Sequence, residues 1–293
     1  MKYLITGGTG SLGQQIIKKL STDPYNQICL FSRDEQKHFV VKHIFPNCEY
    51  ILGDIYDRDS IFACVSQFRP DIVIHAAAQK HVLISDENPY RCVKTNVIGT
   101  QNVVDASIEF NVEKFCFIST DKAYRPTTLY GSTKFIAERI VTQAALSRKN
   151  LIPSTYITGV RYGNVFNSKG SLIPYFLSIA ENKNPVFTVT DKDMTRFFLT
   201  FSEAIDVIIS SLNTLYIDDK KYFRDGIFVV PKLKSIKIID IAEFFAEKYS
   251  GTVKIIGQFE GEKIHEELYN GYCSSDHLMG KDEAIQYLIR NGV

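Results

Sequence analysis

The first half of the chain alternates short, almost wholly apolar runs with longer stretches in which apolar residues recur every three or four positions. Runs such as Ile72-Val73-Ile74 are apolar throughout, which is typical of strands buried on both faces of a parallel sheet. The predicted strands are Lys2–Thr6, Gln27–Ser32, Glu49–Gly53, Asp71–His75, Glu113–Ser119 and Ser154–Arg161. The predicted helices between them are Ser11–Ser21, Asp34–Phe45, Asp57–Phe68, Tyr90–Asn111 and Tyr130–Arg148. This alternation predicts an α/β fold in which helices cover a doubly wound parallel sheet.

The alternation loosens after Asn164. The elements predicted beyond it are a helix that starts at Gly170-Ser171, the helices Phe201–Leu212 and Ile238–Tyr249, and the strands Gly226–Val230 and Thr252–Gly257. We therefore expect two interleaved parts: a cofactor-binding domain over residues 1–164 and a smaller substrate-binding lobe over residues 165–293.

Composition and charge exclude several classes of function. The 293 residues are 45% hydrophobic and 23% charged, as in ordinary globular proteins. With 34 basic and 33 acidic side chains, the net charge of +1 gives no broad field for nucleic acid or anionic lipid. No apolar stretch approaches the ~20 residues that cross a bilayer, and the first residues lack a signal-peptide pattern. We expect a cytoplasmic protein that binds neither nucleic acid nor membrane.

The six cysteines include no CxxC pair. Several of them sit inside apolar runs, as Cys29 and Cys116 do. This distribution predicts buried, reduced thiols and no structural zinc or other metal site.

A glycine-rich turn follows the first strand and opens the first helix. Its residues are Thr6-Gly7-Gly8-Thr9-Gly10-Ser11-Leu12-Gly13. Between a strand and a helix, such glycines allow a tight turn, close approach of a pyrophosphate and close packing of the helix. A P-loop would need Lys-Ser/Thr after the last glycine, where this chain has Gln14-Gln15. The turn therefore predicts a Rossmann dinucleotide site made by Gly7, Thr9, Gly10, Ser11, Leu12 and Gly13.

The second strand ends at Ser32-Arg33-Asp34, where such domains select their dinucleotide. An acidic residue here binds the ribose 2′-hydroxyl of NAD, whereas arginine accommodates the 2′-phosphate of NADP. Ser32 and Arg33 favour NADP. The alternative is that Arg33 caps a surface turn while Asp34 binds the ribose of NAD.

The fifth strand runs into Ser119-Thr120-Asp121-Lys122, and Tyr130 and Lys134 follow on the next helix. Their four-residue spacing places Tyr130 and Lys134 on one helical face. A neighbouring ammonium and a positive nicotinamide ring lower the pKa of a tyrosine, which can then act as a base at a carbinol. We predict this role for Tyr130, with Thr120 as hydrogen-bond partner. The residues Ser119, Tyr130 and Lys134 are also expected to contact the cofactor.

These features resemble the extended short-chain dehydrogenase/reductases, and more closely the inverting UDP-N-acetylglucosamine 4,6-dehydratases of pseudaminic-acid-type pathways. The stretches that carry the resemblance are TGGTGSLG, SRDEQK, GDIYD, HAAAQKHV, KTNVIGTQNV, STDKAYRPTTLYGSTK, VRYGNV, MTRFFLT and GEKIHEEL. The resemblance implies oxidation at C4 of the sugar, loss of water across C5–C6 and hydride return to C6 with inversion of C5. The product would be a UDP-2-acetamido-2,6-dideoxy-L-arabino-hexos-4-ulose.

The Asp121-Lys122 pair distinguishes this group from its relatives. Retaining sugar-nucleotide 4,6-dehydratases carry Asp-Glu at this point, and 4-epimerases carry no such pair. Oxidation at C4 acidifies the C5 proton, so elimination needs one group to take that proton and another to protonate the leaving hydroxyl. The resemblance and this chemistry make Lys122 the base and Asp121 the acid, with exchanged roles left open. The alternative is a surface salt bridge in a turn.

The resemblance implies further contacts. Those expected for the cofactor are Asp54, Ile55, Ala76, Ala77, Ala78 and Asn96. Those expected for the UDP-sugar are Lys80, His81, Asn164, Thr195, Arg196, Glu262 and Lys263. Arg196 is the expected clamp for the diphosphate, because a guanidinium binds phosphate oxygens in pairs. The alternatives are a surface position for Asp54 and a structural role for His81. For the other five the alternative is a surface or packing role: Asn164, Thr195, Arg196, Glu262 and Lys263.

The chain departs from the family pattern at its tail after Tyr269 and at Tyr124-Arg125, where relatives have a small or polar pair. Tyr130 stands where some related dehydratases have Met. Relatives also imply a homo-oligomer.

Other hypotheses remain open. The enzyme alternatives are a nucleotide-sugar 4-epimerase, a retaining 4,6-dehydratase and a dehydratase that also epimerises C3. A different class is a catalytically silent Rossmann protein that binds NADP. The downstream sugar is not indicated.

Overall fold

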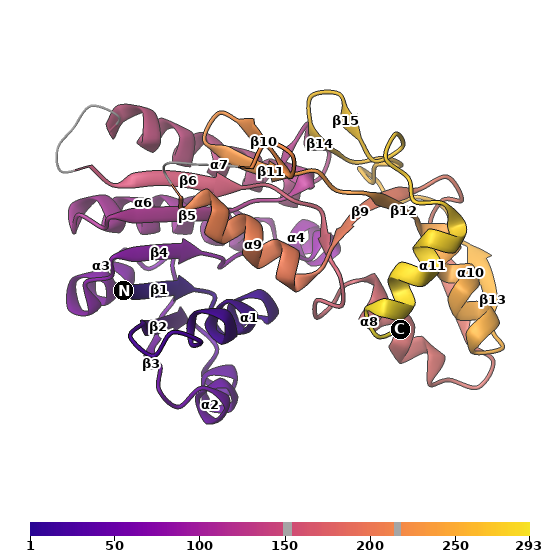
Figure 1. The fold of residues 1–293 in the computed structure, drawn as a ribbon, viewed down its shortest axis with the longest axis horizontal. Coiled ribbons are helices and arrows are strands. Elements are labelled where there is room, and N and C mark those ends of the chain that lie inside the picture. Colours follow the sequence, from indigo (N-terminus) through magenta and orange to yellow (C-terminus); the bar gives the residue numbers. More distant parts are fainter. Residues whose placement is uncertain (149–153, 214–217) are drawn as a thin grey trace.

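The computed structural model describes residues 1–148, 154–213 and 218–293. Within these ranges the main sheet has the strand order β10-β11-β6-β5-β4-β1-β2-β3 (Figure 1). Its strands are β1 (Lys2–Thr6), β2 (Gln27–Ser32), β3 (Glu49–Leu52), β4 (Ile72–His75), β5 (Lys114–Ile118), β6 (Tyr156–Val160), β10 (Tyr222–Asp225) and β11 (Phe228–Pro231). Its neighbouring strands are parallel except for β10 with β11. The predicted doubly wound parallel sheet is confirmed.

The strand order reverses between β1 and β4. The chain moves outward from β1 through β2 to β3 and then returns to β4, which pairs with β1 from Tyr3–Ile72 to Thr6–His75. In open parallel sheets, ligands bind beyond the carboxyl ends of the strands at such a reversal. The glycine turn after Thr6 and the segment after His75 meet at this place.

Helices cover both faces of the sheet. On one face, α3 (Arg58–Phe68), α6 (Gly99–Glu109) and α7 (Leu129–Arg148) pack side by side (Figure 1). On the other face, α1 (Ser11–Leu20) packs against α9 (Phe201–Ser211), while α2 (Glu35–Ile44) joins β2 to β3. Fully buried side chains such as Phe115 and Phe117 of β5 fill the core between the layers. None of the helices in the described ranges is long and apolar enough to cross a membrane.

The predicted helix Tyr90–Asn111 is not one regular helix. It divides into α5 (Pro89–Val93), the π-helical turn η1 (Lys94–Ile98) and α6, and it is preceded by the short α4 (Val82–Glu87). A π-turn inserts an additional residue into a helix and is frequent at functional sites. Asn96 lies in this turn and is buried. The spacing of apolar residues does not reveal this interruption.

The C-terminal lobe consists of small sheets and helices, most of them around a second core, whereas β14 and β15 pack against the first. Its elements are β7 (Asn164–Val165), α8 (Leu172–Ala180), β8 (Val186–Val189), β9 (Thr195–Leu199), β12 (Ser235–Lys237), α10 (Ile238–Lys248), β13 (Thr252–Ile255), β14 (Glu267–Tyr269), β15 (Tyr272–Cys273) and α11 (Lys281–Arg290). The rings of Phe176, Phe187 and Phe245 lie 5.3–5.6 Å apart at the centre of this core.

Part of the predicted lobe belongs with the main sheet. β11 adds to the sheet in parallel beside β6, and all four of its residues are buried. α9 packs on β5 and β6. An apolar strand such as β11 is stable only where its faces are covered, and α9 packs on it. The chain therefore passes between the two parts more than once.

Candidate active site

The glycine turn between β1 and α1 is a tight cradle of backbone. Gly7 has φ +71°, and a Cβ on it would lie 2.8 Å from the backbone of Ala77. A Cβ on Gly13 would lie 2.5 Å from the carbonyl oxygen of Gly8, so only glycine lets α1 begin this close to the turn. Gly10 precedes α1 without a side-chain cap, which leaves the first amides of the helix to a ligand. Leu12 packs against the core, and Ser11 begins the helix.

The ends of β2 and β3 hold the residues predicted to select the dinucleotide. Arg33 lies 3.2 Å from the Asp54 carboxylate and is 40% exposed. Ser32 hydrogen-bonds Thr9 at 3.0 Å, which ties this strand end to the glycine turn. The Asp34 carboxylate caps α2 by accepting from the amide of Lys37 and also pairs with the Lys37 ammonium. These hydrogen bonds lower the pKa of Asp34. Arg33 is thus not the residue that caps the turn.

The segment after β4 is held by the π-turn. Asn96 accepts from the amide of Gln79 at 2.8 Å and donates to its carbonyl at 3.0 Å. The same amide group donates to Thr133 of α7 at 3.0 Å. Asn96 therefore fixes the segment that follows the predicted cofactor contacts Ala76, Ala77 and Ala78.

Ile55, one of the expected cofactor contacts, is buried under the start of α6. A Cβ on Gly99 would lie 2.6 Å from its side chain, and Asn102 donates to its carbonyl at 3.0 Å. The position of Ile55 is thus fixed by α6.

Tyr130 and Lys134 are both buried on the face of α7 that meets the end of β5. The Lys134 ammonium donates to the carbonyl of Ile118 at 2.7 Å, and burial lowers its pKa to about 7. Burial and the nearby Asp121 raise the pKa of Tyr130, whereas a hydrogen bond with Thr120 acts to lower it. The expected lowering of the Tyr130 pKa is therefore not produced by the protein alone.

Asp121 and Lys122 lie in the 3₁₀ turn η2 (Asp121–Ala123) directly after β5. Asp121 is fully buried, and its Oδ1 accepts from Thr120 at 2.9 Å and from the Lys122 ammonium at 3.1 Å. Its Oδ2 is buried without a hydrogen-bond partner among the described residues. The alternative of a surface salt bridge is wrong, because Asp121 is fully buried and the Lys122 side chain is only 22% exposed.

The surroundings of Lys122 keep it charged. Burial acts to lower the pKa of Lys122, but Asp121 and Glu266 outweigh it and the pKa is raised. Its ammonium also donates to Asn164 of β7 at 3.4 Å. The predicted base therefore carries a proton in the protein alone.

The sequence interpretation missed two carboxylates beside this group. Glu266 is 3% exposed, and its Oε1 lies 3.6 Å from the Lys122 ammonium. Glu138 accepts from Ser119 at 2.6 Å and forms two hydrogen bonds with Arg161. Glu138 stands four residues after Lys134, so helical spacing could have identified it. Glu266 lies within the motif GEKIHEEL but carries no local signal of its own.

Lys80 and His81 meet the loop between β7 and α8. Lys80 donates to the carbonyl of Lys169 at 2.7 Å, and the His81 ring lies against Gly170, where a Cβ would approach it to 2.3 Å. Burial lowers the pKa of both side chains. Both residues thus reach the lobe from the main sheet.

Four residues predicted for the UDP-sugar lie in β9 and in the segment before β14. Thr195 is buried and bonded to His265 at 2.9 Å and Ser274 at 2.6 Å. The Arg196 guanidinium donates to three backbone carbonyls at 2.8–3.0 Å and lies 3.7 Å from Glu262. Lys263 donates to the carbonyl of Tyr124 at 2.8 Å. The diphosphate clamp at Arg196 stays a prediction, since these bonds already engage both of its terminal nitrogens.

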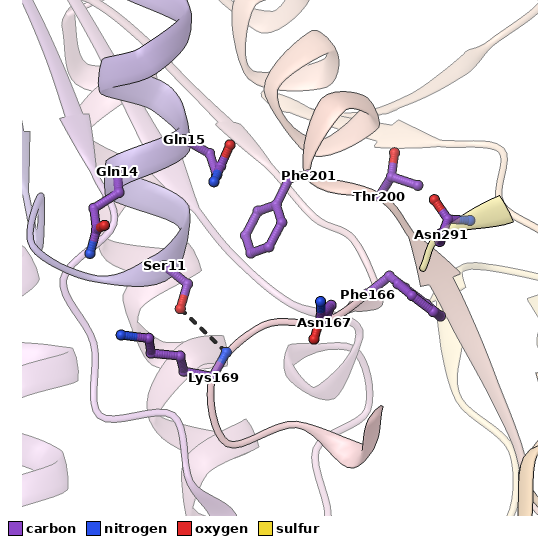
Figure 2. Close-up of a pocket in the computed structure, with 9 residues that line it drawn as sticks. All are labelled: Ser11, Gln14, Gln15, Phe166, Asn167, Lys169, Thr200, Phe201 and Asn291. Carbon is purple, nitrogen blue, oxygen red and sulfur yellow. Dashed lines mark hydrogen bonds between the residues drawn. The ribbon is translucent and has the colours of Figure 1, made fainter. Parts of the chain in front are cut away.

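A cavity of about 380 Å³ adjoins the glycine turn (Figure 2). Its lining residues are Ser11, Gln14, Gln15, Phe166, Asn167, Lys169, Thr200, Phe201 and Asn291. Figure 2 shows the amide of Lys169 donating to the Ser11 hydroxyl, a bond of 3.3 Å that joins the lobe to α1. The cavity is separate from the catalytic turn, because it has no lining residue from η2 or α7.

All six cysteines are unpaired. Cys29, Cys64, Cys92 and Cys116 are buried, whereas the side chains of Cys48 and Cys273 are only partly so. Across residues 1–148, 154–213 and 218–293, no three His, Cys, Asp or Glu side chains gather in a way that could hold a metal ion.

Comparison with known proteins agrees with this geometry. The model of a family described as polysaccharide biosynthesis protein matches residues 3–284. The inverting UDP-N-acetylglucosamine 4,6-dehydratase of Campylobacter jejuni is 38% identical over 266 residues, covering 90% of this chain and 75% of its own. The UDP-glucose 4-epimerase of Rickettsia felis is 31% identical, covering 97% and 81%.

Among solved structures, the UDP-glucose 4-epimerase of Thermus thermophilus in complex with NAD superposes with a TM-score of 0.74. It covers all of both chains at 17% identity, which shows the shared fold alone. The family match and the relative from Campylobacter jejuni together settle the membership. The chain belongs to the polysaccharide biosynthesis protein family of extended short-chain dehydrogenase/reductases.

Proposed function

We propose that the protein is an NADP-dependent UDP-N-acetylglucosamine 4,6-dehydratase that inverts C5. The observation that carries the proposal is the full burial of Asp121, 3.1 Å from the Lys122 ammonium and beside Tyr130. Buried titratable groups with a specific charge partner are candidates for acid–base work. The name of the 38% identical relative supports the same activity.

The residues at the glycine turn fit a nicotinamide dinucleotide. The turn has no room for a Cβ at Gly7 or Gly13, and the uncapped amides of α1 suit a pyrophosphate. A nicotinamide dinucleotide bound here would supply the hydride acceptor for oxidation at C4 and the hydride donor for reduction at C6. The further residues proposed to hold it are Thr9, Ser11, Leu12, Ser32, Asp54, Ile55, Ala76, Ala77, Ala78, Asn96, Ser119, Tyr130 and Lys134.

Arg33 supports NADP over NAD, because its guanidinium is partly exposed at the end of β2 while Asp34 already caps α2. We expect Arg33→Ala to raise the Kd for NADP about tenfold or more and to leave the Kd for NAD nearly unchanged. Titration of both dinucleotides by calorimetry measures this. A selective loss of NAD binding in Asp34→Asn would instead identify NAD as the cofactor.

The first chemical step needs a base at the C4 hydroxyl. Tyr130 takes this role, and the hydrogen bond with Thr120 holds its hydroxyl. Lys134 lies one turn further along α7, and its protonated fraction would favour the phenolate.

The elimination uses Asp121 and Lys122 as a pair. Moving one proton from the Lys122 ammonium to Asp121 gives an amine and a carboxylic acid with no proton exchanged with solvent. The amine then takes the C5 proton, and the acid protonates the C6 hydroxyl, which leaves as water. The pair thereby returns to its ionic form. A solvent proton added to the opposite face of C5 inverts that centre.

The substrate is proposed to lie between η2 and the lobe. Lys80 and His81 approach from the main sheet, and Asn164 contacts Lys122 directly. The lobe residues proposed to bind the UDP-sugar are Thr195, Arg196, Glu262 and Lys263. In this proposal the cofactor binds at the main sheet, and the substrate binds between the main sheet and the lobe. A homo-oligomer in the cytoplasm stays a prediction.

A 4-epimerase is the second candidate, because the 31% identical Rickettsia felis relative carries that name. The buried Asp121–Lys122 pair favours dehydration, since epimerisation needs no acid and base at C5 and C6. Proton NMR of the protein with UDP-N-acetylglucosamine in deuterium oxide, without added reductant, separates the two. We expect a 4-keto-6-deoxy sugar with deuterium at an inverted C5. A C4 epimer without deuterium at C5 would overturn the proposal.

A further inference from the structure

Glu266 is the carboxylate that the C-terminal lobe brings to the catalytic turn. It precedes β14, and its side chain is buried between two lysines. Its Oε1 lies 3.6 Å from the Lys122 ammonium, and its Oε2 lies 3.1 Å from the Lys263 ammonium. Its amide donates to Ser274 at 2.9 Å, which fixes the backbone at this point.

The charged groups around Lys122 come from three elements. Asp121 of its own turn lies 3.1 Å away, Glu266 approaches from the lobe, and Arg196 of β9 acts against them with the opposite sign. The amide oxygen of Asn164 adds a neutral contact at 3.4 Å. Glu266 is in turn shared with Lys263, which is bonded to the carbonyl of Tyr124 just beyond η2.

We propose that Glu266 is a positioning residue that holds the Lys122 ammonium against Asp121 and limits how readily it passes a proton to that carboxylate. The proposal rests on the proposed function. A second carboxylate close to an ammonium stabilises the charged form and opposes formation of the amine. Lys263 partly offsets this effect because it neutralises the same carboxylate. The proton transferred to Asp121 stays within the pair, so no outside donor or acceptor is needed.

This arrangement gives the lobe control over the base. Glu266 and Lys263 both belong to the segment that approaches η2 from the lobe, so the charge felt by Lys122 depends on how the lobe sits. A small displacement of this segment changes a distance of 3.6 Å between unlike charges and with it the balance between ammonium and amine.

The test uses two substitutions with opposite expected signs. Glu266→Gln keeps the size of the side chain and removes its charge, so the pKa of Lys122 is expected to fall by about one unit or more. Lys263→Met leaves Glu266 with Lys122 as its near cation, so the pKa of Lys122 is expected to rise. Glu267→Gln is the matched control, because Glu267 pairs with Arg125 and not with Lys122.

Two measurements follow each variant. The first is the pKa of Lys122 from the pH dependence of its labelling by acetic anhydride, read by mass spectrometry without substrate. The second is the pH profile of deuterium incorporation at C5 with UDP-N-acetylglucosamine, whose alkaline limb is expected to move with the labelling pKa. KM is expected to stay within about twofold for Glu266→Gln.

The outcomes distinguish a failure of the proposed function from a failure of the inference about Glu266. If the wild-type protein forms no 4-keto-6-deoxy sugar, the proposed function fails, while the labelling still decides whether Glu266 controls Lys122. If Glu266→Gln lowers kcat equally at every pH and leaves the labelling pKa unmoved, Glu266 is merely structural and the inference is overturned. Should Glu266→Gln fail to fold, Lys263→Met decides through its opposite shift, and an unmoved pKa there overturns the inference.

Discussion

Tyr130 is the proposed base at C4 of the sugar and Lys122 the proposed base at C5. Removing either side chain should therefore stop the reaction at a different stage. Tyr130→Phe removes the base at C4 and is expected to cut hydride transfer by about 10²-fold or more. Lys122→Ala is expected to leave C4 oxidation in place and to abolish exchange at C5. Absorbance of the reduced nicotinamide reports the first step, and NMR in deuterium oxide reports the second. Full turnover in Lys122→Ala would show that Asp121 or another group is the base.

Lys134 makes the stability of the protein depend on pH. Burial lowers its pKa to about 7 from the ordinary 10.5, so between these values the unfolded chain binds a proton that the folded chain does not. The free energy of unfolding therefore rises with pH across that window. The destabilisation caused by burying a charged Lys134 is complete below about pH 7.

Lys134→Met removes the titrating group. The Tm of this variant should therefore exceed that of the wild type most near pH 7 and progressively less toward pH 10. Thermal unfolding of the cofactor-free protein at a series of pH values measures the difference. Lys18→Met, on the exposed side of α1, is the control and should show no such trend. A difference that stays constant with pH would mean that Lys134 is charged throughout.

At the scale of single elements, the start of α1 depends on Gly13. A Cβ there would lie 2.5 Å from a backbone carbonyl that has no freedom to move aside. Gly13→Ala is expected to lower the free energy of unfolding by about 1–3 kcal/mol and to weaken dinucleotide binding about tenfold or more. Denaturant unfolding and calorimetric titration measure the two effects.

Gly280→Ala provides the control, because Gly280 stands at the N-terminal end of a helix, as Gly13 lies in the first turn of one, but has no atom within 4 Å of its Cβ position in the described structure. Its stability and affinity should match the wild type. Equal effects of the two substitutions would mean that the packing of α1 on the turn is not what requires glycine.

Elements with strong local patterns are the ones that the sequence predicts well. The predicted bounds of β1 and β2 agree with the structure, because apolar runs bounded by turns are a local property. β9 and α11 escape prediction because β9 pairs with β12 and α11 packs on α10, partners that lie tens of residues away along the chain. The π-turn at Asn96 is not predicted either, because it leaves the spacing of apolar residues nearly unchanged.

The same distinction applies to the site. Asp121, Lys122, Tyr130 and Lys134 stand close together in the sequence, and the structure brings them together at the end of β5. Glu266 reaches Lys122 from more than a hundred residues away, through the fold of the lobe. A contact of this kind depends on how the two parts of the chain pack, which single-sequence patterns do not encode.

At the scale of the whole molecule, Arg161 at the end of β6 joins the parts that carry the site. It bonds Glu138 of α7 at 2.9 and 2.7 Å, Asp225 of β10 at 2.7 Å and the carbonyl of Leu268 in β14 at 3.0 Å. Both members of the Arg161–Glu138 pair are nearly fully buried. Removing Glu138 takes away the buried partner of this charge and leaves Arg161 only the partly exposed Asp225.

Glu138→Ala should therefore lower the free energy of unfolding by about 3–5 kcal/mol, as measured by denaturant titration. The control is Glu283→Ala, which breaks the exposed Lys234–Glu283 pair and should cost less than about 1 kcal/mol. The double variant Glu138→Ala, Arg161→Ala should cost less than the sum of the two single variants, because the second substitution removes the buried charge whose main partner the first takes away. If Glu138→Ala costs no more than Glu283→Ala, the contacts of Arg161 do not hold α7, β10 and β14 together, and the lobe must be fixed to the main sheet by its apolar packing instead.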